Sequence, residues 1–210
     1  MRLIPTLLLV FISLSTFAQE EWQLKRDKTG VKVYTKHVEG SGLKAIKATA
    51  TFPCDLSTCV AVLRDIPHLT ELFPDCEKTE KVTQTDNDQI HYLNLNAPWP
   101  VTDRDATFHL TYEYRPESET VFIQADIINE KYPEQNGMIR LTKGIGTWTF
   151  KKAGDQTELI YRFHGEPGGN IPDWLANSVV EDNPLEMLQN FRELVKLPRY
   201  QGKHFTFLNP

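Results

Sequence analysis

The sequence predicts an α+β fold in which a curved antiparallel sheet wraps around a long C-terminal helix. Apolar and polar residues alternate with a period of two in many segments between 31 and 165, as in strands with one buried face. The longest helical pattern comes last, from about 172 to 196, and carries an apolar stripe. Strands and helices are grouped rather than alternating, which favours α+β over α/β.

The predicted elements follow in a simple order. A short amphipathic helix over 20–26 comes first. Two later helices are expected, one that Asp55 caps and that ends at Ile66–Pro67, and one over 68–73. The C-terminal helix is expected to be interrupted at Asn183–Pro184, since proline breaks helices. The predicted strands are 31–37, 43–52, 76–85, 89–96, 104–114, 120–129, 137–143, 145–152 and 157–165.

The first 18 residues have the parts of a cleavable secretory signal. Arg2 provides a positive charge near the N-terminus, and Thr16–Ala18 resembles a signal-peptidase cleavage site. The apolar run Leu7–Leu14 is too short to span a bilayer, since spanning takes about 20 apolar residues. An apolar first helix and a retained anchor are the alternatives. We expect the mature chain, 19–210, to form one domain with its core at about 22–196, exported to the periplasm or secreted.

Composition excludes several classes of function. The net charge of −5 becomes −6 when Arg2 is removed, so nucleic acid is not an expected partner. Cys54, Cys59 and Cys76 cannot all pair internally, and buried free thiols are expected. Cys54 and Cys59 are five residues apart with no histidine nearby to complete a zinc pattern, so we expect no metal site and no cofactor.

Four local sequences carry a family resemblance: Trp22 with Asp27–Tyr34, Ala97–Asp105, Gly146–Trp148 and Pro167–Asn177. Together they are similar to the START (steroidogenic acute regulatory protein-related lipid transfer) domain family. The resemblance runs from Trp22 to Val195 and implies a helix-grip fold with an internal apolar cavity, in a small single-domain exported member. It also implies binding, and transfer, of a lipid, a sterol or another apolar molecule without chemistry, by a monomer that contacts membranes transiently.

Arg104 is the leading candidate for a ligand contact. It shares the strand phase of Ala106, Phe108, Leu110 and Tyr112, so it points toward the core, where a charge is costly unless paired. It is either a polar anchor for a ligand or a structural ion-pair partner of Asp103, Glu77 or Glu80, while Asp105 faces the other way and stabilises loops. The predicted ligand-binding residues are Arg104, Phe108, Leu110, Tyr112, Trp174 and Leu175.

Gly168 and Gly169 supply a sterically free joint before Pro172, which suits a first helical turn. We predict that they are the hinge of a lid, Ile171–Val180, that admits the ligand. The alternative is an ordinary helix N-terminus with a tight turn. Core packing rather than ligand contact is expected for Trp22, Trp99 and Trp148.

Two other classes of function compete with a carrier. An enzyme of the same fold would need an acid–base set such as Asp103–Asp105 with His109, but Arg104 and His109 lie on opposite faces of their strand and no nucleophile motif is present. We therefore expect no enzyme activity. A protein-interaction module would use a sheet edge or the tail 201–210. Isolated surface positions are expected for His37, His91, His109 and His204.

Overall fold

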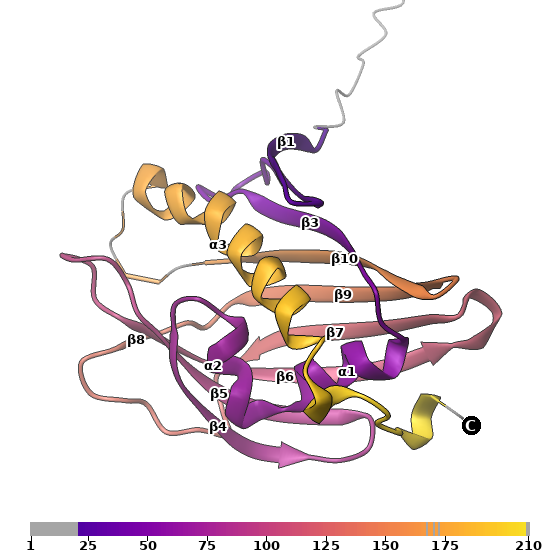
Figure 1. Ribbon diagram of the computed structural model, residues 1–210. Helices are drawn as coiled ribbons and strands as arrows, with labels where there is room; N and C mark the ends of the chain where they lie inside the picture. Colours follow the sequence, from indigo (N-terminus) through magenta and orange to yellow (C-terminus); the bar gives the residue numbers. More distant parts are fainter. Residues whose placement is uncertain (1–20, 167, 170, 172, 209–210) are drawn as a thin grey trace, which may run out of the picture.

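The computed structural model describes residues 21–166, 168, 169, 171 and 173–208 (Figure 1). Within 173–180, Asn177 is the residue whose side chain is described. The predicted export segment, 1–18, lies outside the described residues. The side chains of Trp174 and Leu175 lie outside them as well.

One curved sheet forms the body of the molecule, and its strands follow the order β1-β2-β3-β10-β9-β7-β6-β5-β4. Neighbours are antiparallel, except that β8 pairs with β6 in parallel. The predicted helix-grip α+β class is confirmed. The strands are β1 (Gln23–Lys28), β2 (Val31–Lys36), β3 (Ala45–Phe52), β4 (Cys76–Gln84), β5 (Asp88–Leu95), β6 (Arg104–Arg115), β7 (Thr120–Ile128), β8 (Ile139–Arg140), β9 (Gly144–Ala153) and β10 (Gln156–Gly165).

The long helix α3 lies across one face of the sheet, and α1 and α2 lie on the same side (Figure 1). The predicted cap of α1 is confirmed, since the Asp55 carboxylate accepts a hydrogen bond from the Thr58 backbone N–H at 2.7 Å. The helices are α1 (Leu56–Arg64), η1 (Ile66–His68), α2 (Leu69–Leu72), η2 (Pro116–Ser118), α3 (Asp173–Leu194), η3 (Pro198–Tyr200) and η4 (Thr206–Leu208).

The core sits between the C-terminal half of α3 and the middle of the sheet. The Phe191 ring centroid lies 4.8 Å from that of Phe52, 5.7 Å from Phe150 and 6.2 Å from Trp148. Of the apolar positions that alternate along β2 and β3, Val31, Val33, Ala48, Ala50 and Phe52 are buried and Ile46 is half-buried. In the predicted helical stripe, Leu188, Phe191 and Val195 are buried and Leu185 is half-buried. The three cysteines are also buried and free, with Cys54 Sγ 3.2 Å from Cys59 Sγ.

The helix predicted over 20–26 was wrong, because Gln23–Lys28 is strand β1, paired with β2. Leu24 is 51% exposed, so burial of an apolar face does not hold this segment in place. Pairing with β2 instead satisfies the backbone groups of the segment. The turn between the two strands contains Thr29 and Gly30, both with positive φ.

The predicted break at Asn183–Pro184 was also wrong, because α3 continues through Pro184. Proline removes one intrahelical hydrogen bond. The flanking turns are held by tertiary contacts: the Asn183 amide donates to the Asp75 carboxylate, and Met187 and Leu188 are buried. Tertiary packing therefore outweighs the local propensity. The predicted strand 137–143 shrinks to the two residues of β8.

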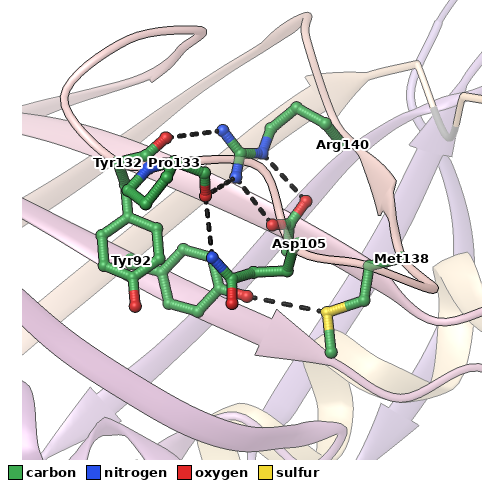
Figure 2. A network of polar contacts seen from close by, with 7 residues as sticks. Tyr92, Asp105, Tyr132, Pro133, Met138 and Arg140 are labelled. Atoms are coloured by element: carbon green, nitrogen blue, oxygen red, sulfur yellow. Dashed lines mark hydrogen bonds and ion pairs between the residues drawn. The ribbon is translucent and has the colours of Figure 1, made fainter.

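A buried ion pair fastens a loop to the outer face of the sheet (Figure 2). Arg140 donates to both Asp105 carboxylate oxygens, at 2.9 and 2.7 Å, and the two side chains are 7% and 1% exposed. Arg140 also donates to the backbone carbonyls of Tyr132 and Pro133. The Tyr132 ring stacks on Tyr92, with centroids 3.9 Å apart. The prediction that Asp105 faces away from Arg104 and stabilises a loop is confirmed.

We predict that Asp105→Asn lowers the free energy of unfolding by about 3–5 kcal/mol, because it leaves the buried Arg140 charge without its counterion. The matched control is Glu113→Gln, which removes an exposed bidentate pair with Arg115 and should cost less than about 1 kcal/mol. Urea unfolding of the two variants measures both. Equal losses would contradict the structural role of the buried pair.

Candidate ligand-binding site

A cavity of about 350 Å³ lies between the concave face of the sheet and the helices. Strands β3, β5, β6, β7, β9 and β10 supply its wall, and α1, α2, α3 and several loops complete it. The wall is predominantly apolar, which suits a hydrophobic ligand. Representative side chains are Leu93, Phe108, Leu110, Ile127, Trp148 and Phe163.

Gly146 leaves space for the aromatic ring of Phe163 on the cavity wall. A Cβ at this position would lie 3.1 Å from the Phe163 ring on the neighbouring strand, closer than ordinary van der Waals contact. Trp148, two residues further along β9, faces the same side and lines the cavity. The Gly-x-Trp sequence therefore combines a gap for one aromatic ring with a second aromatic ring.

Arg104 stands at the start of β6 on the cavity wall and is 7% exposed. Its guanidinium donates to the carbonyl of Thr102 and to that of Gly168, the latter at 3.4 Å. Burial lowers its pKa, and the nearby charge of Asp103 acts in the opposite direction. Of the carboxylates considered as partners, Glu80 pairs with Lys78, and Glu77 is exposed.

Some of the residues predicted to contact the ligand line the cavity, and one does not. Arg104, Phe108 and Leu110 lie on the cavity wall. Tyr112 does not line the cavity: its ring lies 5.8 Å from that of Phe207 and 5.1 Å from the Arg64 guanidinium. The C-terminal segment that contains Phe207 packs back on the core, so a contact between Tyr112 and ligand has no support in this geometry.

Sequence reasoning missed His91. A surface position was expected, but the side chain is 3% exposed and lines the cavity from β5, and this expectation was wrong. Burial lowers its pKa to about 4, so the ring is neutral near pH 7. The available signal was strand phase, because His91 alternates in register with Leu93 and Leu95, which also line the cavity.

The core position predicted for Trp99 was wrong as well. Its side chain is 93% exposed, although the neighbouring Pro98 and Val101 line the cavity. The loop between β5 and β6 turns its indole outward, away from any strand that could cover it. The structure thus brings an exposed aromatic ring to the edge of the cavity.

A curved sheet that wraps around a C-terminal helix and encloses an apolar cavity is suited to the binding of an apolar ligand. The family model of the START domain matches residues 4–200 of this chain. The chain therefore belongs to the START domain family.

Three relatives illustrate the likeness. The chain is 36% identical to an uncharacterised protein of Pseudomonas aeruginosa, over 82% of this chain and 86% of that protein. It is 34% identical to a STAR-related lipid transfer protein of Xanthomonas axonopodis, whose crystal structure matches with a TM-score of 0.79 over 84% of this chain and 99% of that one. It is 22% identical to mouse phosphatidylcholine transfer protein, over 75% of each chain.

The two glycines of the predicted hinge lie in a packed turn. Gly168 and Gly169 have φ values of 62° and 64°, which favour glycine. A Cβ on Gly168 would lie 3.0 Å from the Ile139 side chain, and one on Gly169 would lie 2.7 Å from it. Both conformation and space therefore require glycine here. The hinge function itself stays a prediction.

We predict that Gly169→Ala lowers the free energy of unfolding by more than the roughly 1–2 kcal/mol expected from the left-handed backbone alone. The matched control is Gly154→Ala, at a turn with the same φ of 64° and nothing within 4 Å of the added Cβ. Thermal or urea unfolding gives both values. Equal destabilisation would show that the Ile139 contact contributes nothing.

Proposed function

We propose that this protein is an exported, non-enzymatic carrier that binds one lipid or similar apolar molecule in its cavity and transfers it between membranes. The observation that carries the proposal is an apolar cavity of about 350 Å³ with the buried guanidinium of Arg104 on its wall. The names of two relatives, a STAR-related lipid transfer protein and phosphatidylcholine transfer protein, support a lipid as ligand.

The volume of the cavity points to a small lipid. About 10–15 Å³ of open cavity space accommodates one water-sized group, so this cavity holds roughly 23–35 such groups. A methylene group is similar in size to a water molecule. The best match is therefore a single-chain amphiphile or a compact ring system rather than a lipid with two long chains.

The residues considered for acid–base chemistry do not converge, which supports a carrier. Asp105 is held by Arg140 on the outer face of the sheet, whereas Arg104 faces the cavity. His109 pairs with Asp88 at 2.5 Å and does not line the cavity. Within the part of the chain that the structure describes, no group of three or more side chains could hold a metal ion.

Transfer requires contact with a membrane, and Trp99 is suited to it. A tryptophan ring combines an apolar body with a polar N–H and favours membrane–water interfaces. The ring is exposed beside cavity-lining residues, so contact here would bring the ligand site to the lipid surface. Among the described helices, none has the length and apolar character needed to cross a membrane.

We predict that Arg104→Leu weakens the binding of a fluorescent single-chain fatty acid about tenfold or more, because it removes a charge-assisted anchor. Arg104→Lys should retain more affinity, and Lys152→Leu, at an exposed position that does not line the cavity, is the charge-matched control. Fluorescence titration and thermal melting are measured on the same samples. Native binding by Arg104→Leu together with a large loss of stability would assign Arg104 a structural role instead.

We predict that Trp99→Ala slows the transfer of a bound fatty acid between phospholipid vesicles several-fold at unchanged affinity. Trp99→Phe should retain part of the rate, because it keeps an apolar ring. Exposed Leu24 lies on the edge strand β1 and provides Leu24→Ala as a control for general loss of surface hydrophobicity. Equal transfer rates for the wild type and Trp99→Ala would exclude this loop as the membrane contact.

A further inference from the structure

His91 is a polar ring set into an apolar part of the cavity wall. It is opposite Phe108 in the β5–β6 ladder, and the two rings stack with centroids 5.9 Å apart. Leu93 on the same strand and Leu110 on the next also line the cavity. A side chain with two polar nitrogens is costly in such a place unless both nitrogens have partners.

A chain of hydrogen bonds determines which ring nitrogen carries the proton. Gln84 Nε2 donates to the carbonyl of Arg64 at 2.8 Å and to Gln89 Oε1 at 3.2 Å. Gln89 Nε2 donates to the carbonyl of Leu63 at 3.1 Å and lies 3.3 Å from His91 Nδ1. Both carbonyls lie in the last turn of α1, and a carbonyl can only accept. The donor and the acceptor of each hydrogen bond in this series are therefore assigned.

Because the Gln89 amide is the donor, His91 Nδ1 must accept, and the neutral ring carries its proton on Nε2. That second nitrogen has no hydrogen-bond partner among the residues that the structure describes. His91 lines the cavity, so an oxygen atom of a bound ligand could accept a hydrogen bond from this N–H.

The separation of His91 and Arg104 along the sheet sets the distance between the two polar groups that a ligand would need. Arg104 and Phe108 are four residues apart on β6, which corresponds to roughly 13 Å along a strand. His91 lies beside Phe108 on β5. Arg104 and His91 therefore lie at the two ends of this interval, and the apolar pair Leu93 and Ala106 lies between them on the same two strands.

We propose that His91 is a second ligand anchor, whose Nε2–H donates a hydrogen bond to an oxygen carried by the far end of the ligand. The inference rests on the proposed carrier function and narrows its ligand class. The ligand is then an extended single-chain or ring-fused amphiphile with one polar group for Arg104 and a hydroxyl or carbonyl oxygen roughly 13 Å away.

Two probes of almost equal size test the assignment: dodecanoic acid and ω-hydroxydodecanoic acid, which adds a hydroxyl at the far end of the chain. Their affinities for the full mature protein are compared by calorimetry. We expect the wild type to prefer the hydroxy acid about fivefold, as for one net hydrogen bond. In His91→Phe the preference should reverse, because the buried hydroxyl loses its partner. His91→Gln, which keeps an N–H donor, should retain a preference.

The control variant is His109→Gln, which removes a histidine that lies on the neighbouring strand and does not line the cavity. It should keep the wild-type preference, and thermal melting shows that each variant is folded. Nitrogen NMR shifts of the His91 ring give a readout independent of affinity. They should report the Nε2–H form in the wild type and a mixture of both neutral forms in Gln89→Leu.

The possible failures are distinguishable. If neither acid binds the wild type, the proposed carrier function for a single-chain amphiphile is contradicted. If both bind equally to the wild type and to His91→Phe, only the His91 assignment is overturned. An Nδ1–H ring in the wild type would also overturn it, because the ring would then present an acceptor to the ligand.

Discussion

The structure depends on the packing of Phe191 against the aromatic side chains of the sheet. Contacts with Phe52, Trp148 and Phe150 fix the C-terminal half of α3 in the concave face. A helix with its side chains is about 10–12 Å across, so one helix cannot fill the whole interior of a sheet this wide. The part beyond Phe191, covered by Met187, Pro184 and the surrounding loops, remains as the cavity.

Strand β6 carries two buried charged side chains, Asp105 and Arg104, which have different roles on its two faces. On the outer face, Asp105 meets Arg140 in a two-point ion pair that holds the loop before β8 in place. On the inner face, Arg104 reaches the carbonyls of Thr102 and Gly168. These carbonyls belong to two loops that border the cavity, so Arg104 connects the ligand site with both. Because successive side chains of a strand point to opposite faces, two adjacent residues of β6 can serve the outer and the inner face.

Local sequence patterns predicted most of the helices and strands, and they predicted the part of the cavity wall that β6 supplies. The phase of Arg104, Phe108 and Leu110 is a property of a single strand, and all three lie on the cavity wall. His91 obeys the same rule on β5, but an isolated histidine was assigned to the surface by its usual exposure. Its partner Gln89 and the carbonyls at the end of α1 come together only in the fold.

The α+β class, the faces of the strands, the cap at Asp55 and the inward direction of Arg104 can be predicted from sequence, because they follow from alternation and backbone hydrogen bonding over a few residues. Three features emerge only in the folded protein: Gln23–Lys28 is a strand, α3 continues through Pro184, and Trp99 is exposed. Each of these depends on what a distant segment covers or pairs with, and no local pattern contains that information.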